Sequence, residues 1–186
     1  EKYFKVDVKN FEEVEEWVDS LEFDSEITLI NCAGISYNSF THKSDPEIWK
    51  NVIDVNLVGT YNVIRALLPR MRDDNFGRII NFSSVTAQKG TPGISAYSAS
   101  KSALWGLSKS IAVENASKGI TINNINLGYS ELGMIEQVPE TYKEVIKKQI
   151  PNGGFCKKED LFSTVNFLRN NEYTNGSSID LNGGFF

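Results

Sequence analysis

The stretch Ser95-Ala96-Tyr97-Ser98-Ala99-Ser100-Lys101 decides how the rest of the chain is interpreted. The residues that follow it are mainly Ala, Ser, Leu and Trp, without a proline through Leu107, and this pattern predicts a helix. Residues four apart on a helix stand on one face, with Cβ atoms about 5–6 Å apart. Tyr97 and Lys101 are therefore predicted to be neighbours.

This pair predicts acid–base chemistry. A free phenol has a pKa of about 10, so a tyrosine that exchanges protons near neutrality needs its phenolate stabilised by about 3–4 kcal/mol. A cation about 4 Å away, at an effective dielectric near 20, supplies about 4 kcal/mol. We therefore predict that Lys101 lowers the pKa of Tyr97, a general acid/base, and that the Ser84 hydroxyl holds the substrate oxygen. The alternative is structural, because a half-buried tyrosine four residues from a solvated lysine is common on helices.

Strand and helix patterns alternate along the whole chain. Apolar or β-branched runs predict strands over residues 3–8, 27–30, 78–82, 120–126 and 178–181. Helical patterns cover residues 11–21, 45–71, 95–118, 139–150 and 158–168. This alternation predicts an α/β fold, a doubly wound parallel sheet with helices on both faces.

Three stretches with small or polar residues directly follow predicted strands. They are residues 31–34, Ser84 and residues 127–129. In open α/β sheets ligands bind outside the carboxyl ends of the strands, so these stretches are predicted to form one site. A buried strand also needs turn-forming residues after it, so any one stretch alone has an equally good structural explanation.

Composition bounds the possible partners and location. The 186 residues, 40% of them hydrophobic, predict a single domain over residues 1–186, and no apolar run approaches eighteen residues. A net charge of −5 argues against nucleic acid or an anionic membrane as the main partner. Cys32, Cys156 and the single His42 offer neither a disulfide framework nor metal-ligand spacing. We expect no leader peptide, no metal and a reducing, cytoplasmic location.

Several motifs occur in an order that resembles the short-chain dehydrogenase/reductase family. Tyr97 and Lys101 match its Tyr-x-x-x-Lys signature, and Ser84 lies thirteen residues before the tyrosine. Asn31-Cys32-Ala33-Gly34 is similar to the family's Asn-Asn-Ala-Gly motif with the second Asn replaced. Residues 54–59 resemble the helix of its catalytic asparagine, and residues 6–8, 118–123 and 176–184 match in type and order. The resemblance implies a Rossmann-like fold.

The resemblance also implies residue roles. Tyr97 is the acid/base, Lys101 lowers its pKa and bonds the nicotinamide ribose, and Ser84 orients the substrate oxygen. Asn56 holds a water that links Lys101 to solvent; alternatively or in addition, it caps or kinks its helix by bonding a backbone carbonyl. The implied cofactor-binding residues are Asp7, Val8, Asn31, Ala33, Gly34, Tyr97, Lys101 and Gly128.

The chain departs from the family pattern at its start. The family's first strand, Gly-rich phosphate loop and second strand would precede Tyr3, whereas the first glycine here is Gly34. With a strand order of 3-2-1-4-5-6, about 45 missing residues would leave a gap beside residues 27–30. We therefore expect an N-terminally incomplete domain that is not self-sufficient, with residues 1–21 held only by helix packing. The residue that selects NAD or NADP would lie in the missing part, so the choice stays open.

The predicted function is an NAD(P)-dependent oxidoreductase that transfers a hydride between nicotinamide and a ketone or secondary alcohol. The pattern most resembles 3-oxoacyl-carrier-protein reductases, with a small-molecule or carrier-bound carbonyl substrate. Arg70, Arg72 and Lys118 are candidate contacts for an acidic carrier. One alternative is a sugar or polyol dehydrogenase. Another is a degenerate, non-catalytic binding or scaffold member, which the missing loop and Leu127 and Leu132, at positions where the family has Pro and Thr, would favour.

Apolar residues on two predicted helices suggest association into a homo-dimer or homo-tetramer. They are Leu67, Leu68, Leu104, Trp105 and Leu107. Family members commonly pair these helices between subunits. The alternative is that all five pack against the chain's own sheet.

Overall fold

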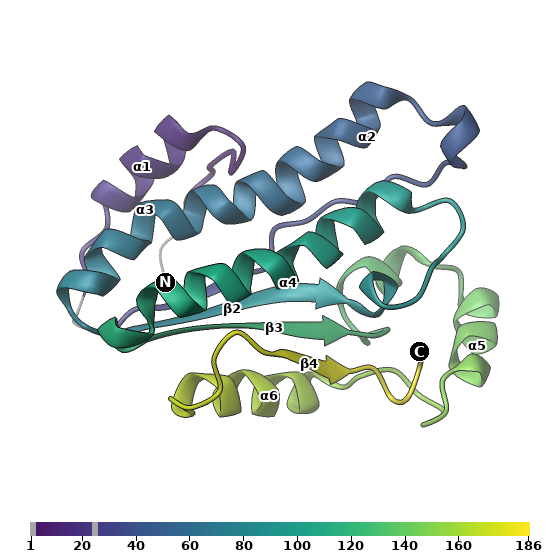
Figure 1. Ribbon diagram of the computed structural model, residues 1–186. Helices are drawn as coiled ribbons and strands as arrows, with labels where there is room; N and C mark the ends of the chain where they lie inside the picture. The colour runs from purple at the N-terminus through teal and green to yellow at the C-terminus, as the bar shows by residue number, and fades with distance from the viewer. Residues whose placement is uncertain (1–2, 24–25) are drawn as a thin grey trace.

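Four parallel strands form the sheet in the computed structural model, which describes residues 3–23 and 26–186 (Figure 1). They are β1 (Thr28–Asn31), β2 (Gly77–Ser84), β3 (Ile120–Leu127) and β4 (Ser178–Leu181). The strands neighbour one another in the order β1-β2-β3-β4. The predicted parallel α/β fold is confirmed, and each of these strands lies within two residues of its predicted bounds.

The strand predicted over residues 3–8 is wrong. This segment has no regular secondary structure, and Val6 and Val8 instead pack against the main apolar cluster. An alternating pattern forms a strand only where a neighbouring strand accepts and donates its backbone hydrogen bonds. Within the described residues, the sheet ends at β1 and offers this segment no partner strand.

Six α-helices accompany the described strands. They are α1 (Phe11–Asp19), α2 (Pro46–Ile53), α3 (Thr60–Asp73), α4 (Ser95–Asn115), α5 (Glu140–Gln149) and α6 (Lys158–Asn170). Short 3-10 turns follow β2 (η3, Val85–Ala87) and precede α5 (η5, Gly133–Gln137). Asn10 and Asp45 each cap a helix by accepting two backbone N–H bonds on the side-chain oxygen. The helix pattern read from the sequence is thus confirmed in order and nearly in length.

One predicted helix differs in detail. The sequence predicts a continuous helix over residues 45–71, but the structure places a π-helical segment, η2 (Asp54–Gly59), between α2 and α3. A π-helix accommodates an extra residue per turn and often marks a functional position. Asn56 lies in this segment and is fully buried.

The helices form layers on the two faces of the sheet (Figure 1). Helices α2, α3 and α4 lie over one face, with α1 packed on α3, and α6 lies on the other face. Helix α5 stands beyond the carboxyl ends of the strands. In the parts of the chain that are described, none of the helices combines the length and apolar character that crossing a membrane requires.

Two of the five residues expected at a subunit interface are internal. Leu67 and Leu104 are buried within the chain, and Leu68 and Leu107 pack partly against the main apolar cluster. The helix periodicity marks an apolar face correctly, but it does not say which neighbour covers that face. Leu67 and Leu104 are therefore not available for a contact with a second subunit.

Candidate active site

The hydroxyl of Ser84 and the phenol of Tyr97 lie together at the carboxyl end of β2. Ser84 is the last residue of β2, and its side chain is hydrogen-bonded to Tyr97 in the first turn of α4. The Ser84 oxygen also accepts from the Thr86 backbone N–H at 3.2 Å and from the Thr86 hydroxyl at 3.0 Å. Because both Thr86 groups donate, the Ser84 hydrogen remains free to point at Tyr97 or at a bound oxygen atom.

The pKa of the Tyr97 phenol moves in the opposite direction from the one predicted. Burial raises it above its usual value, and the hydrogen bond with Ser84 only partly offsets this rise. The expectation that Lys101 lowers this pKa is therefore wrong for the ligand-free chain. The physical reason is geometric, since the Lys101 ammonium lies 5.7 Å from the centroid of the Tyr97 ring and is held elsewhere.

Lys101 is a buried cation held by the neighbouring strand. Its side chain donates to the Phe82 carbonyl at 2.6 Å, and the residue is only 5% exposed. Burial lowers the pKa of Lys101 to about 8, an effect that the nearby Cys32 thiol opposes when ionised. For Cys32 in turn, burial raises the thiol pKa and the Lys101 charge works against that rise.

Asn56 uses its whole side-chain amide to hold the backbone after β1. The amide donates to the Ile35 carbonyl at 2.9 Å and to the Ser100 hydroxyl at 3.0 Å, and its oxygen accepts from the Ile35 N–H at 2.8 Å. The Thr60 hydroxyl donates to the Asn56 carbonyl at 2.9 Å. Asn56 does bond a backbone carbonyl, as the structural alternative expected, but it is that of Ile35 rather than one in its own helix. Its two amide N–H groups are occupied, and its side-chain oxygen retains one lone pair that can accept from a water.

The stretch after β1 brings a glycine to the same place. A Cβ atom on Gly34 would lie 3.5 Å from both the Asn56 oxygen and the Lys101 nitrogen. Ala33 next to it is exposed, whereas the Asn31 amide donates to the Asn81 side chain at 2.8 Å inside the sheet. Ala33 and Gly34 thus leave the approach to Lys101 open, and Asn31 supports the sheet.

Gly128 follows β3 and is required by close packing. A Cβ atom here would lie 2.8 Å from the Cα of Asn182, and the Gly128 N–H donates to the Leu181 carbonyl at 2.9 Å. Any side chain at this position would push apart the ends of β3 and β4. Gly128 therefore allows the ends of β3 and β4 to lie close together at the carboxyl edge of the sheet.

Asp7 and Val8 have partners other than the central cluster. The Asp7 carboxylate accepts from the Lys9 N–H at 3.0 Å, and its ion pair with the Lys9 ammonium spans 3.8 Å. The Val8 carbonyl accepts from Asn62 at 2.9 Å, and a Cβ atom on Gly59 would clash with the Val8 side chain. Within the described residues, neither is hydrogen-bonded to Ser84, Tyr97 or Lys101. Val8 lies beside η2, and the Asp7 N–H donates to Glu13 in the first turn of α1 at 2.7 Å.

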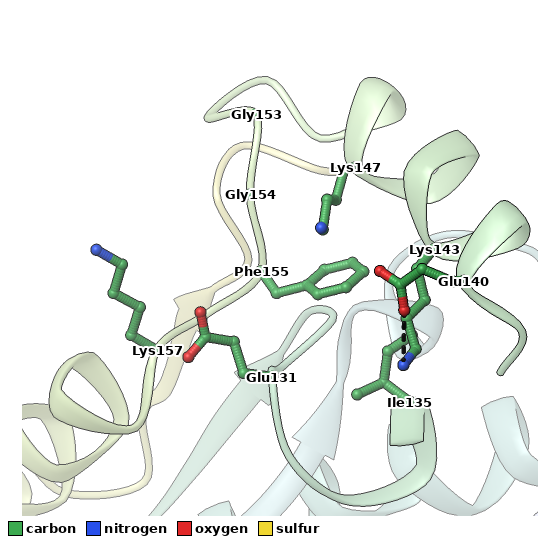
Figure 2. Close-up of a pocket in the computed structure, with 9 residues that line it drawn as sticks. All are labelled: Glu131, Ile135, Glu140, Lys143, Lys147, Gly153, Gly154, Phe155 and Lys157. Atoms are coloured by element: carbon green, nitrogen blue, oxygen red, sulfur yellow. Dashed lines mark ion pairs between the residues drawn. The ribbon is translucent and has the colours of Figure 1, made fainter. Parts of the chain in front are cut away.

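A cavity of about 410 Å³ lies between α5 and residues 153–157 (Figure 2). The Lys147 side chain reaches toward the Phe155 ring, 5.4 Å from its centroid, and Glu131, in the segment after β3, also lines the cavity. A second cavity, of about 450 Å³, shares Phe155 and adjoins Tyr129 and Leu181. Ser84, Tyr97 and Lys101 line neither cavity, so both hollows lie beside the polar cluster.

The basic residues suggested for a carrier lie at the wrong edge of the sheet. Arg70 pairs with Asp74 at 3.2 Å, Arg72 donates to Asn115, and Lys118 donates to Asn75 at 3.5 Å. These positions are at the carboxyl ends of α3 and α4, where the chain enters β2 and β3. Since the helices run antiparallel to the strands, a helix ends opposite the carboxyl edge of the sheet, and the suggestion is wrong.

Several polar residues next to the cluster were missed from the sequence. The Trp105 indole N–H is shared between Ser83 at 3.1 Å and Asn126 at 2.9 Å. Ser100, fully buried, donates to the Tyr97 carbonyl at 2.8 Å. The available signal was the repeated asparagine in β3, Asn123-Asn124-Ile125-Asn126, because polar residues in a buried central strand need bonded partners.

Comparison with known proteins finds a family model and relatives that match most of the chain. The family model described as short chain dehydrogenase matches residues 2–143. The acetoacetyl-CoA reductase of Shinella zoogloeoides is 39% identical over 188 residues, which cover 98% of this chain and 78% of that protein. The 3-oxoacyl-[acyl-carrier-protein] reductase of Staphylococcus aureus strain N315 is 37% identical over 167 residues, 89% of this chain and 68% of that protein.

A solved structure shares the fold. The crystal structure of 3-oxoacyl-[acyl-carrier protein] reductase from Brucella melitensis superposes with a TM-score of 0.88 at 30% sequence identity. The match covers 96% of this chain and 69% of that chain. This chain thus corresponds to between two thirds and four fifths of the length of the relatives named here.

Proposed function

The chain belongs to the short-chain dehydrogenase family of NAD(P)-dependent oxidoreductases, and on that premise we propose that it reduces the 3-keto group of an acyl thioester. The curated relatives include reductases of acetoacetyl-CoA and of 3-oxoacyl-carrier-protein substrates, both of which are 3-keto thioesters. We assign the activity to one domain, because all the proposed catalytic groups stand on a single sheet and its helices.

One observation carries the proposal, the placement of Ser84, Tyr97 and Lys101 around the carboxyl end of β2. Ser84 bonds Tyr97, and Lys101 bonds the backbone of Phe82, two residues before Ser84. A hydroxyl donor, a phenol and a buried cation together can bind a carbonyl oxygen and protonate it. These three residues are our proposed catalytic groups, with Asn56 holding the neighbouring backbone of Ile35.

The raised pKa of Tyr97 keeps the phenol protonated, as the reduction direction requires, but also makes it a weaker acid. A phenol that stays protonated near neutral pH can donate its proton to the keto oxygen while the Ser84 hydroxyl bonds the same atom. Lys101, whose ammonium donates to the Phe82 carbonyl at 2.6 Å, contributes a buried positive charge beside the site and does not donate to Tyr97. The proposed proton donor to the substrate is therefore Tyr97 alone.

The residues present fit a nicotinamide cofactor. The Lys101 ammonium is a buried donor beside Gly34, whose missing side chain leaves the backbone after β1 accessible, and Ala33 is exposed next to it. Lys101, Ala33 and Gly34 would hold the nicotinamide end, with Gly128 narrowing the opposite side. When bound, the dihydronicotinamide supplies the hydride that converts the keto carbon into a secondary alcohol.

The cleft of Figure 2 supports a substrate with a long arm. It lies between α5 and residues 153–157, past the strand ends, and is lined by the aromatic ring of Phe155, by Glu131 and by Lys143 and Lys147, which pair with Glu140 at 3.3 Å and Glu144 at 2.7 Å. An acyl thioester extends an amide-containing phosphopantetheine arm away from its keto group. We propose that this cleft receives the arm, with the Phe155 ring providing apolar contact.

The experiment is a steady-state assay that follows the loss of NADH or NADPH absorbance. Acetoacetyl-CoA and acetoacetyl-carrier-protein serve as test substrates, and a hexose and a polyol serve as controls for the dehydrogenase alternative. We expect turnover of a 3-keto thioester with at least one of the two cofactors. Cofactor binding without turnover of any ketone would contradict the proposal and favour a binding or scaffold role.

We further propose a cytoplasmic homo-oligomer. The unpaired thiols of Cys32 and Cys156 are stable in a reducing compartment. The large apolar side chains Ile48, Val58 and Tyr61 on α2, η2 and α3 are partly exposed, as expected where helices contact a second subunit. Light scattering at micromolar concentration tests the assembly, and a monomer would contradict it.

A further inference from the structure

A buried asparagine connects the proposed catalytic groups to the loop beyond them. Asn126, in β3, is 1% exposed and accepts the shared indole N–H of Trp105. Its own amide donates to the Asp180 carboxylate in β4 at 2.7 Å. Asn126 thus has one bond toward the catalytic helix and one away from it.

The first connection leads to Lys101 and Ser84. Trp105 stands one helical turn after Lys101 in α4 and donates to the Ser83 hydroxyl as well as to Asn126. The Ser83 hydroxyl donates to the Lys101 carbonyl at 2.9 Å, while the Lys101 ammonium donates to the carbonyl of Phe82. The end of β2 is therefore fastened to α4 by consecutive bonds, and the indole sets the orientation of the Ser83 hydroxyl in the middle of them.

The second connection leads to the loop that follows Ser84. Asp180 accepts from the Gln88 amide at 2.7 Å through the same oxygen that accepts from Asn126. Gln88 lies directly after η3, four residues beyond Ser84. The carboxylate therefore ties this loop to β3 and, through Asn126, to the catalytic helix.

We infer that Asn126 is a positioning residue for the reaction, acting through Trp105 and Ser83 on the placement of Lys101 and Ser84. The inference rests on the proposed function of those two residues. Directional hydrogen bonds restrict the relative positions of two groups more narrowly than apolar contacts do. Small displacements of reacting groups strongly reduce the reaction rate. Asn126 acts without touching substrate or cofactor.

The chain contains a matched control two residues earlier in β3. Asn124 is also fully buried, accepts from the Ser108 hydroxyl of α4 at 2.9 Å and donates to Ser178 of β4 at 3.1 Å. This bridge has the same form as that of Asn126, but it lies one row farther from the carboxyl edge. In the described part of the chain, the side-chain partners of Asn124 are Ser108 and Ser178, and neither is hydrogen-bonded through its side chain to Ser84, Tyr97 or Lys101.

The test compares Asn126→Ala with Asn124→Ala in the full chain. Both substitutions leave buried groups unpaired and are expected to lower the Tm by similar amounts. Asn126→Ala is expected to reduce kcat about tenfold with little change in cofactor affinity, and Asn124→Ala to keep kcat within about twofold. Equal kcat values for the two variants, whether both high or both low, would overturn the inference.

A double-mutant cycle tests the route through the indole. Trp105→Phe keeps an aromatic ring in this position and removes the N–H donor together with the pyrrole part of the indole. If the route is right, the double variant Trp105→Phe/Asn126→Ala loses little more kcat than the more affected single variant. Losses that multiply would show that Asn126 does not act through Trp105.

A measurement without turnover separates this inference from the proposed function. NMR titration measures the pKa of the Lys101 ammonium, which depends on how deeply the ammonium is buried. In the wild-type chain this pKa is expected to be about 8. Asn126→Ala is expected to move this pKa toward the ordinary value of 10.5, as water gains access, and Asn124→Ala is not. An inactive wild type would reject the proposed function, whereas an unchanged Lys101 pKa in Asn126→Ala would reject the positioning role.

Discussion

Near the carboxyl edge of the sheet, its two faces contact their helices through different interactions. Under α4, two rows of paired strand residues are polar and bonded across the sheet, namely Asn81, Asn124 and Ser178, and Ser83, Asn126 and Asp180. Ser108 bridges the first row and Trp105 the second. Toward α6, the intervening row of Phe82, Ile125 and Ile179 is apolar and packs with Leu168.

This difference means that some residues mainly fix the positions of side chains and others mainly contribute to the free energy of unfolding. Apolar contacts contribute free energy in proportion to the area removed from water and tolerate small shifts. Hydrogen bonds contribute less on balance but lose strength steeply when the geometry changes. Near the carboxyl edge, the α4 face, which carries Tyr97 and Lys101, is therefore fixed by directional bonds and the α6 face by apolar contacts, whereas nearer the amino ends of the strands Ile79 and Ile122 join the main apolar cluster under α3 and α4. Substitutions on the two faces should affect different measurements.

The largest expected effect is on the α4 face. Tyr97→Phe removes the phenolic proton and is expected to reduce kcat by about a thousandfold or more, corresponding to about 4 kcal/mol. Cofactor affinity, measured by fluorescence titration, should stay nearly unchanged, and so should the Tm. The exposed Tyr61 provides the control, because Tyr61→Phe should leave kcat unaltered. Substantial turnover by Tyr97→Phe would show that another group supplies the proton.

The next effect belongs to the α6 face. Leu168 is 1% exposed, and Leu168→Ala is expected to cost about 3 kcal/mol of the free energy of unfolding. Leu168→Met, which conserves volume, should cost less than about 1.5 kcal/mol. Denaturant titration measures both. If Leu168→Ala reduces kcat at temperatures where it is folded, the two faces are not separable.

Lys101→Met tests the role of one residue in both turnover and cofactor binding. Loss of the buried cation is expected to lower kcat about a hundredfold and to weaken cofactor binding, because the ammonium is the donor beside Gly34. Lys109→Met, at an exposed position two turns later in α4, is the matched control. A normal Kd for the cofactor in Lys101→Met would remove Lys101 from the cofactor site.

The smallest expected effect is a pH dependence with opposite signs for activity and stability. Lys101 has a pKa of about 8 in the folded chain against an ordinary value of 10.5, so between these values the unfolded state binds more protons. The contribution of Lys101 to stability therefore rises as the pH rises from about 8 to 10.5. The rate of reduction should fall over the same range, because the ammonium is lost.

The comparison with Lys101→Met isolates this group from the others. Cys32 and Tyr97 also face Lys101 and titrate at alkaline pH, so the wild-type profile contains their contributions. The free energy of unfolding is measured against pH for the wild type and for Lys101→Met, and the difference between the two curves should rise between pH 8 and 10.5. A difference that does not change with pH would mean that Lys101 has an ordinary pKa in the folded chain.

Much of the fold was predictable from the sequence for a local reason. Buried parallel strands appear as continuous apolar runs ended by glycine or asparagine, and helices carry their own caps, as at Asn10 and Asp45. The strand expected over residues 3–8 failed because a strand also requires a neighbour. The π-helical segment was missed because the local helical pattern continues through it, and the bonding of its Asn56 to Ile35 joins residues 21 positions apart.

The candidate site was predictable in its members and less so in its geometry. Helical spacing places Tyr97 and Lys101 on one face, but it does not reveal that the Phe82 carbonyl holds the ammonium. Consequently the direction of the Tyr97 pKa shift was predicted wrongly. The polar rows of β2 and β3 were missed because their residues alternate with isoleucine, so that the segment resembles an ordinary buried strand.

The π-helical segment between α2 and α3 has a consequence for rotation about the helix axis. In an α-helix each residue advances the chain by about 100°, so one residue accommodated in η2 changes the phase between α2 and α3 by roughly that angle. This offset allows Trp49 to donate to Ser95, at the start of α4, at 3.0 Å while Leu67 and Met71 still face the interior. Deleting a single residue such as Val58 would restore a regular helix and turn Trp49 away from the helix that carries Tyr97.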